Sequence, residues 1–152
     1  MRRVVTIAIA VAVALAATAC RAPGEPPLHP NDATYRDLIR REVATASSAL
    51  GSGELLLAQA RAGKITMTYA EVGLRQTADD LDGVATDLAQ VTPPARRAPA
   101  QQHLRAIVAN DRLLLRTIAD HWASPQTLAR AEARAAADQK RVSGPLSNTL
   151  GA

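Results

Sequence analysis

Cys20 is the only cysteine in the 152-residue chain, and its thiol is the side chain best placed for covalent chemistry. It follows an uncharged, mostly apolar run of 13 residues, 4–16, that opens after Arg2 and Arg3 and closes on three small residues. A basic start, an apolar middle and a small-residue cleavage site together make up an export signal. Because a helix needs about 20 apolar residues to span a bilayer, the run predicts a removable signal rather than a permanent membrane helix.

The stretch Leu-Ala-Ala-Thr-Ala-Cys at residues 15–20 resembles a bacterial lipobox. Ala17 stands where the usual lipobox has Leu, and the family pattern tolerates Ala at that position. The resemblance implies that Cys20 receives a lipid thioether and that cleavage then removes residues 1–19. A diacylglyceryl group would hold the mature protein on the membrane, because two acyl chains anchor stably whereas one does so only marginally. The expected location is the extracytoplasmic face of the cell membrane, with membrane lipid as the partner of acylated Cys20.

An ordinary secretory signal is the alternative. Cleavage after Ala17-Thr18-Ala19 would leave Cys20 as a free thiol at the new N-terminus. An unpaired, exposed thiol is a liability in an oxidising compartment, and acylation would remove it. We therefore favour lipidation of Cys20.

The histidines do not form a metal site by spacing. His103 and His121 lie 18 residues apart, about 27 Å along a helix axis, so they cannot bind one ion together. The Glu-x-x-His pair of di-iron bundles is absent, because Ala100 and Ile118 stand three residues before each histidine. We expect no metal.

Other catalytic and cofactor motifs are also missing from the sequence. It contains no Cys-x-x-Cys-His haem attachment motif, no Gly-x-Ser-x-Gly elbow and no glycine-rich phosphate loop. No pair of carboxylates is marked as buried by its position. We therefore predict that the protein is not an enzyme and carries no cofactor.

Two groups of charged residues have helical spacing. Carboxylates at 79, 80, 82 and 87 are expected to form a solvated face, with Arg75 and Asp79 as a weak surface pair one turn apart. The second group is basic: Arg105, Arg112, Arg116, Arg130 and Arg134. These arginines could contact anionic lipid headgroups, or they could be an ordinary solvated flank opposite the acids, which we favour.

Removal of the signal would leave 133 residues, enough for one domain with a modest core. The formal net charge of +4 falls by two when Arg2 and Arg3 leave, and a near-neutral chain argues against nucleic acid as a partner. The chain has no Phe, two Tyr and one Trp, so its core must be built from Leu, Ile, Val and Ala. This composition favours close helix packing and predicts an all-α domain.

Residues 20–31 are expected to be a lipid-anchored, Pro-rich tether. Four prolines within residues 21–30 block helix and sheet, and an extended spacer of ten residues would reach about 30 Å. A disordered tail without a spacing role is the alternative.

Four helices are predicted over residues 32–145. The first begins at Asn31 or Asp32 and continues to about Ala62, because its apolar phase passes unbroken through Gly51-Ser52-Gly53; Gly63 caps its end. The second begins with a capping box at Thr68-Tyr69-Ala70-Glu71 and is stopped by Pro93-Pro94.

The third helix is predicted to begin near residues 95–99 and to run to Trp122. The fourth begins with Ser124 as cap and Pro125 at the first helical position, and is expected to end at Gly144-Pro145. A flexible tail, 146–152, would follow. Short connections make neighbouring helices antiparallel, which predicts an up-down-up-down four-helix bundle after the cleaved signal and the tether.

The mature domain also resembles small helical-bundle lipoproteins and secreted proteins of high-GC actinobacteria. The resemblance covers roughly residues 33–122 and rests on Ala-Gly-Lys-Ile-Thr at 62–66, Tyr69, the Pro93-Pro94 break and the His103-Leu104 helix. Such families mostly lack an assigned activity, so it implies fold and location only.

Three functional hypotheses follow. The leading one is a non-catalytic, lipid-anchored interaction or structural module of the envelope, with a possible envelope protein partner and no assigned oligomeric state. The second is a protein that binds a small apolar ligand or lipid in the bundle interior, suggested by Gly53, Gly73 and many core alanines. The third is a regulator that covers a partner by helix-in-groove contact, which would require an exposed apolar stripe.

Overall fold

A computed structural model describes residues 31–121 and 124–151 of the chain, so Cys20 and the predicted tether up to Pro30 lie outside the described residues. The described residues are almost entirely helical, which confirms the predicted all-α class. The elements are α1 (Asp32–Arg61), α2 (Met67–Ala89), the 3₁₀ turn η1 (Ala95–Arg97), α3 (Ala98–Asp120), α4 (Pro125–Arg141), the π-helical turn η2 (Val142–Leu146) and α5 (Ser147–Gly151).

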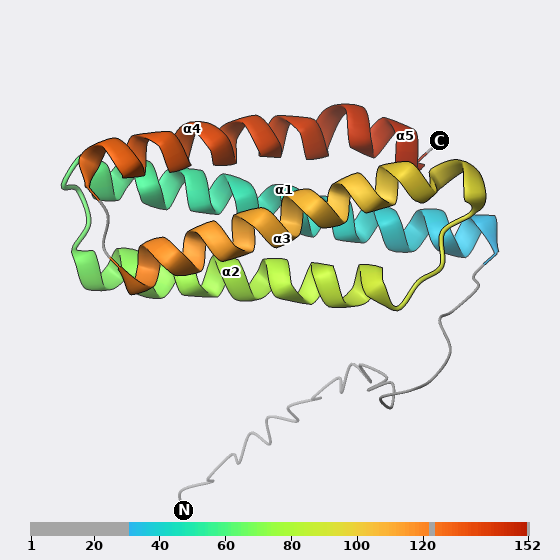
Figure 1. Ribbon diagram of the computed structural model, residues 1–152, viewed down its shortest axis with the longest axis horizontal. Coiled ribbons are helices and arrows are strands. Elements are labelled where there is room, and N and C mark those ends of the chain that lie inside the picture. The colour runs from blue at the N-terminus through green and yellow to red at the C-terminus, as the bar shows by residue number, and fades with distance from the viewer. Residues whose placement is uncertain (1–30, 122–123, 152) are drawn as a thin grey trace, which may run out of the picture.

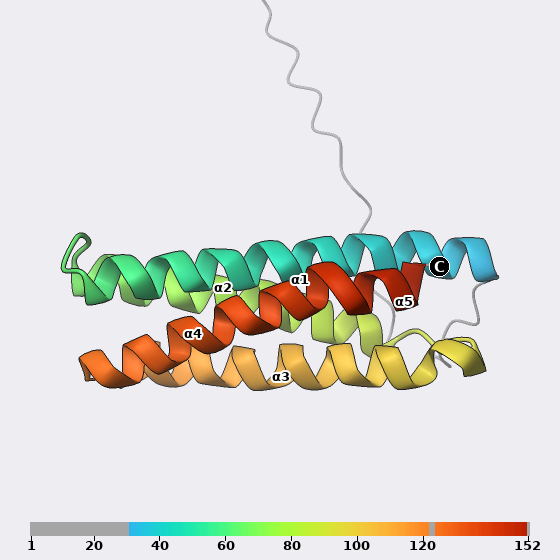
Figure 2. The ribbon, with the colours of Figure 1, turned by 90° about the horizontal axis from the view of Figure 1, so that it is seen from above.

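The four long helices lie side by side, and the chain reverses its direction between each helix and the next (Figure 1). Helix α1 packs extensively against α2 and α4, and α2 packs extensively against α3. The direct contact between α3 and α4 is much smaller, and α4 crosses the others at an angle when the molecule is seen from above (Figure 2). The seam between α3 and α4 is therefore much less tightly packed than the seams of α1 with α2 and α4 and of α2 with α3.

Helix α1 passes through Gly51 and Gly53 without a break, which confirms the prediction of one long helix. A Cβ atom at Gly53 would lie 3.3 Å from Cδ1 of Leu115, so the missing side chain allows α3 to approach closely. At its start, Asn31 Oδ1 accepts a hydrogen bond of 2.9 Å from the backbone N–H of Thr34, as an N-cap should. Gly63 follows the end of the helix with φ of +65°, a conformation that glycine adopts readily.

The predicted start of the second helix is wrong by two residues. Thr66, not Thr68, is the cap, because its hydroxyl accepts a hydrogen bond of 3.2 Å from the backbone N–H of Tyr69. Thr66 has an extended backbone, as an N-cap requires, whereas Thr68 already lies within the first turn of α2. The helix ends at Ala89, before the Pro93-Pro94 pair that was expected to stop it.

The third and fourth helices begin close to where they were predicted. η1 covers Ala95–Arg97 and leads directly into α3. Ser124 caps α4, with Pro125 as the first helical residue and a hydrogen bond of 3.3 Å from the backbone N–H of Thr127 to the Ser124 hydroxyl.

The predicted end of the fourth helix at Gly144-Pro145 is wrong. The helix continues beyond Arg141 as the π-helical turn η2, which contains Pro145, and then as α5. A π-helical turn changes the spacing of the backbone hydrogen bonds, so a proline without an N–H can be accommodated there. Because Leu146 and Leu150 are buried in the core, residues 146–151 are a packed end of the bundle rather than the expected flexible tail.

The core is built from leucine, isoleucine, valine and alanine, with Tyr35 as its one aromatic residue among the described residues. Its largest fully buried apolar side chains are Tyr35, Ile39, Leu50, Leu57, Leu74, Leu81, Leu88, Leu104, Leu115 and Leu150. All four long helices contribute to this single core, which fixes the seams at which polar side chains meet.

Candidate functional site

The predicted lipidation site, Cys20, lies outside the described residues, so its modification remains a prediction. Helix α1, which follows the predicted tether in the sequence, begins at one end of the long axis of the molecule (Figure 1). Of the described helices, none is both long and apolar enough to span a membrane.

A cluster of polar side chains fastens the start of α1 to η1. Asp32 forms an ion pair of 2.8 Å with Arg96 and one of 3.4 Å with Arg97. The Arg97 side chain is buried, and its guanidinium carbon lies 5.5 Å from the centre of the Tyr35 ring, close enough for a cation–π interaction. The first turn of α1 is therefore held by both charge and aromatic contact.

Tyr35 and Gln101 continue this cluster into the core. The Tyr35 hydroxyl donates a hydrogen bond of 2.8 Å to Oε1 of Gln101, and Nε2 of Gln101 donates to the carbonyl oxygens of Leu88 and Val91 at 3.0 and 3.1 Å. Burial raises the pKa of Tyr35 to about 12, although the nearby Arg97 charge acts in the opposite direction. Tyr35 is thus a neutral structural donor that links α1, α2 and α3.

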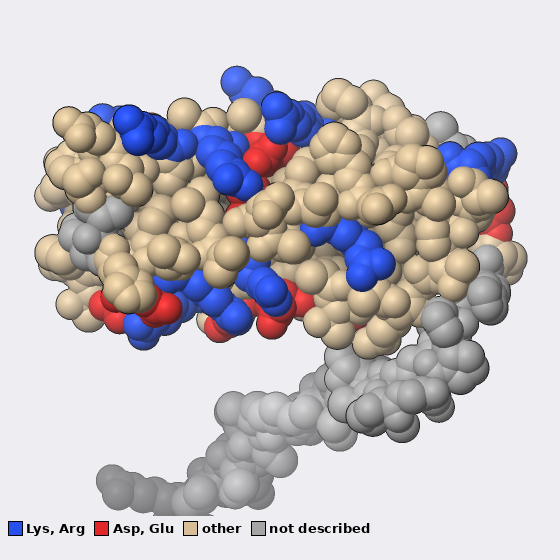
Figure 3. All heavy atoms as spheres, viewed as in Figure 1, with Lys and Arg blue, Asp and Glu red and all other residues tan. Residues whose placement is uncertain are grey.

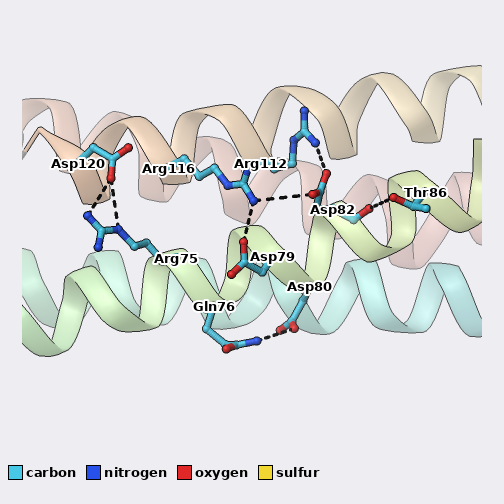
Figure 4. Close-up of polar contacts among 9 residues, drawn as sticks. All are labelled: Arg75, Gln76, Asp79, Asp80, Asp82, Thr86, Arg112, Arg116 and Asp120. Carbon is cyan, nitrogen blue, oxygen red and sulfur yellow. Dashed lines mark hydrogen bonds and ion pairs between the residues drawn. The ribbon is translucent and has the colours of Figure 1, made fainter. Parts of the chain in front are cut away.

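Ion pairs join the solvent side of the seam between α2 and α3 (Figure 4). Nη2 of Arg116 lies 2.7 Å from Oδ1 of Asp79 and 3.8 Å from Oδ2 of Asp82, while Arg112 also contacts Asp82. The acidic residues of α2 therefore face the arginines of α3, and two of those predicted as a purely solvated face are engaged across the seam.

The predicted surface pair between Arg75 and Asp79 is wrong. Arg75 instead forms ion pairs of 2.9 Å with Glu71 on its own helix and with Asp120 on α3. Asp79 is turned toward Arg116, as the close-up shows (Figure 4). Arg75 therefore pairs within α2 with a different acid than expected and also pairs across to α3, while Asp79 pairs only across the seam among the ion pairs of the described residues.

The five arginines predicted as a possible lipid-binding patch do not share one environment. Arg112 and Arg116 pair with acids of α2, and Arg134 pairs with Asp111. Arg105 and Arg130 are exposed. On the face shown in Figure 3, basic and acidic side chains lie interspersed rather than as one basic surface.

A buried carboxylate pair between α3 and α4 was not predicted. Asp111 is 1 % exposed and Asp138 is 5 % exposed. Nε of Arg134 lies 3.0 Å from Oδ1 of Asp111 and 3.7 Å from Oδ2 of Asp138, while Nη1 of Arg141 lies 2.9 Å from Oδ1 of Asp138. The two buried carboxylates thus share one cation, the guanidinium group of Arg134.

The sequence does carry a signal for this pair. Asp111 stands in the buried phase of α3 between Leu104, Val108 and Leu115, at a position where an apolar residue is expected. Asp138 occupies the corresponding position on α4, between the buried Ala135 and Val142. A charged residue in the apolar phase of a helix indicates a buried polar contact.

Glu42 is a further buried carboxyl group, on the side of α1 that faces the end of α2. Burial raises its pKa, the charge of Asp87 adds to that effect, and Arg41 opposes it. Glu42 and Asp87 line a hollow of about 360 Å³ at this seam. Asp87 is therefore a second acid beside Glu42, and Arg41 is the basic residue that lines the same hollow.

The histidines are not gathered into a ligand set. His103 lines a hollow between α3 and α4, and His121 follows the last residue of α3. Within residues 31–121 and 124–151, no three side chains of His, Cys, Asp or Glu come together as a metal site would require.

The largest hollow among those described is an open groove of about 630 Å³ between α1 and the C-terminal segment. Its lining combines small hydroxyl-bearing residues with apolar ones: Arg40, Val43, Ala44, Ser47, Ser48, Gly51, Ser52, Leu55, Gln139, Ser143 and Ser147. A mixed groove of this kind could hold an elongated amphipathic ligand.

The glycines suggested as places for an internal cavity are filled. Leu115 and Thr77 lie against Gly53, and Leu56 lies against Gly73 so closely that a Cβ there would be 2.8 Å from its Cδ1. Both glycines therefore serve close helix packing.

No family model matches this chain, and no curated protein or solved structure shows significant similarity to it.

Proposed function

We propose that this protein is a lipid-anchored envelope protein whose helical domain acts as a non-catalytic interaction or structural module. The observation that carries the proposal is the position of Cys20, the only cysteine, directly after an export signal. In this proposal the signal, 1–19, is cleaved, residues 20–31 form the tether, and an antiparallel up-down-up-down bundle stands on the extracytoplasmic face of the membrane.

The arrangement of the helices supports this proposal. Helix α1 begins at one end of the long axis and spans about 45 Å, so its far end, where α2 begins, lies well away from the tether attachment (Figure 1). A domain held by its α1 end would present the start of α2 outward.

Three large apolar side chains are exposed at the start of α2. Met67, Tyr69 and Val72 are 56, 64 and 62 % exposed, within six consecutive residues. Clustered exposed apolar side chains are typical of protein contact sites. We therefore place the contact with an envelope protein partner at this end, because the rest of the described surface offers mixed charges instead of clustered apolar side chains.

Lipidation is tested by growing cells with labelled palmitate and following the label into the full-length protein. The wild-type chain is expected to carry the label and to fractionate with membranes, whereas Cys20→Ser is expected to lose both properties. Thr18→Ser, a conservative change two residues earlier, serves as the control and is expected to behave like wild type. Equal labelling of wild type and Cys20→Ser would refute the anchor.

The groove between α1 and the C-terminal segment supports a second candidate, binding of a small apolar ligand or lipid. The glycines Gly53 and Gly73 suggested from the sequence that such a ligand would bind in the bundle interior. Because both glycines are packed against side chains, the groove is the better place for it. Native mass spectrometry of gently purified protein is expected to show a copurifying ligand that is lost in the groove-filling variant Ser48→Phe. Gln126→Phe, at an exposed position outside the groove, is the matched control. A ligand-free wild type would exclude this candidate.

A further inference from the structure

The carboxyl group of Asp111 has one satisfied and one unsatisfied oxygen. Oδ1 accepts a hydrogen bond of 3.0 Å from Nε of Arg134. Oδ2 is buried and receives no hydrogen bond from any donor in the described residues. A buried carboxylate oxygen without a donor is costly, because ionised groups lose their hydration on burial.

The neighbour of Asp111 across the seam is another acceptor, Asp138. Two ionised carboxylates cannot hydrogen-bond to one another, but a protonated carboxyl group can donate to an ionised one. Burial raises the pKa of Asp111 to about 6, and the Asp138 charge and a hydrogen bond with Asp138 act in the same direction, although Arg134 opposes the shift. The pair therefore lacks one donor, and a proton would supply it.

The surroundings of the pair contain few other charges. Arg134, Asp138 and Arg141 come from α4, and His103 lies on α3 and lines the same hollow of about 420 Å³. No ionisable side chain of α1 or α2, in the part of the chain that is described, contributes to the pKa shift of Asp111. The charge balance of the seam is thus set by groups on α3 and α4.

The seam that holds the pair also has little direct packing between its two helices. Helix α4 packs mainly on α1 and makes little direct contact with α3. The hollow beside Asp138 already separates the two helices in part. A change of charge at this place can therefore move α4 relative to α3 without dismantling the core between α1, α2 and α3.

We propose that Asp111 and Asp138 share one proton in the folded protein and that loss of this proton loosens the seam between α3 and α4. This effect of the shared proton on the packing of α4 does not depend on lipidation of Cys20. On an exported domain it would make the packing of α4 respond to the pH of the surroundings.

The direction of the effect follows from proton linkage. The unfolded chain binds the Asp111 proton with a pKa near 3.8 and the folded chain with a pKa of about 6. The folded state therefore binds more protons between these values, and the stabilising contribution is full below pH 3.8 and is lost as the pH rises through 6. The folding equilibrium constant is expected to fall about 100-fold from this group alone.

The test compares urea unfolding of the full mature chain at several values between pH 4 and pH 8, in wild type and Asp111→Asn. Wild type is expected to lose about 100-fold in its folding equilibrium constant relative to the variant, whose amide does not titrate. Asp80→Asn removes an exposed carboxylate on α2, and His103→Gln removes the other titratable side chain of the hollow; both are expected to keep the wild-type pH dependence. Identical pH profiles for wild type and Asp111→Asn would overturn the shared proton.

Two measurements on the folded wild type keep the proposal testable if Asp111→Asn does not fold. Carbon-detected NMR is expected to show the Asp111 carboxyl group titrating near pH 6, and nearer its ordinary value in Asp138→Asn. Hydrogen exchange, corrected for the intrinsic pH dependence, is expected to show faster opening of α4 at pH 7.5 than at pH 5, with α2 unchanged. Titration of Asp111 near pH 4, or equal opening of α4 at the two values, would contradict it.

Discussion

The hydroxyl of Tyr35 and the side-chain amide of Gln101 lie 2.8 Å apart and join the first turn of α1 to the first turn of α3. Gln101 also donates hydrogen bonds to the backbone carbonyl groups of Leu88, near the end of α2, and of Val91, which follows that helix. Three helices are thereby held together at the end of the molecule where α1 begins (Figure 1). The link is buried, so its loss has a measurable cost.

Tyr35→Phe is expected to destabilise the protein by about 1–2 kcal/mol, because Oε1 of Gln101 would be left buried without a donor. Urea unfolding at constant pH measures the change. Tyr69→Phe removes the same atom from an exposed side chain and should alter stability by less than about 0.5 kcal/mol. Equal effects of the two substitutions would show that the buried bond contributes nothing.

Two glycines that lie inside helices, Gly83 in α2 and Gly53 in α1, are expected to respond in opposite ways to substitution. Gly83 lies in α2 with open space around its Cα, so Gly83→Ala should stabilise by about 0.5–1 kcal/mol through helix propensity. Gly53→Leu should destabilise by about 1–3 kcal/mol, because Leu115 and Thr77 already fill the adjacent space. Thermal unfolding of both variants checks the contrast, and tolerance of leucine at position 53 would contradict the close packing of α1 and α3.

The C-terminal segment is expected to be an integral part of the fold. Leu150 is fully buried, so Leu150→Ala should cost about 2–4 kcal/mol. Thr149→Ala, an exposed change at the adjacent position, is the control and should cost less than about 1 kcal/mol. A neutral Leu150→Ala would support a frayed tail instead.

Two arginines of α3 and α4 should differ because their partners differ in burial. Arg116→Gln is expected to cost less than about 1 kcal/mol and to cost less still in high salt, since Arg116 pairs with exposed carboxylates. Arg134→Gln at pH 7.5 is expected to cost about 2 kcal/mol, because it leaves the buried Asp111 carboxylate without its cation.

Lowering the pH is expected to narrow the difference between the costs of these two substitutions. At pH 5 the Asp111 carboxyl group, with its pKa of about 6, is mostly protonated, so the cost of Arg134→Gln should shrink toward that of Arg116→Gln. Unfolding titrations of both variants at pH 5 and 7.5 provide the comparison. A cost of Arg134→Gln that is the same at both pH values would argue against an ionisable partner.

The all-helical architecture could be predicted from the sequence because the relevant signals are local. The unbroken apolar phase through Gly51 and Gly53 outweighed the usual helix-ending role of glycine, and the Ser124-Pro125 pair marked the start of α4 within one residue. Both features depend on residues a few positions apart.

Features set by contacts between distant segments were predicted poorly. Whether Pro145 ends a helix depends on the burial of Leu146 and Leu150 against the core, which no local pattern reports. The partners of Arg75 and Arg116 depend on how α2 and α3 align, so spacing within one helix suggested the wrong pair. Asp111 and Asp138 could have been noticed in the apolar phase of their helices, but their proximity could not.

Mass spectrometry of the N-terminal peptide of the protein isolated from its own cell membrane tests the central proposal most directly. The account predicts a chain that begins at Cys20 and carries a diacylglyceryl group on its sulfur. A mature chain that begins elsewhere, or that begins at Cys20 with an unmodified thiol, would contradict it.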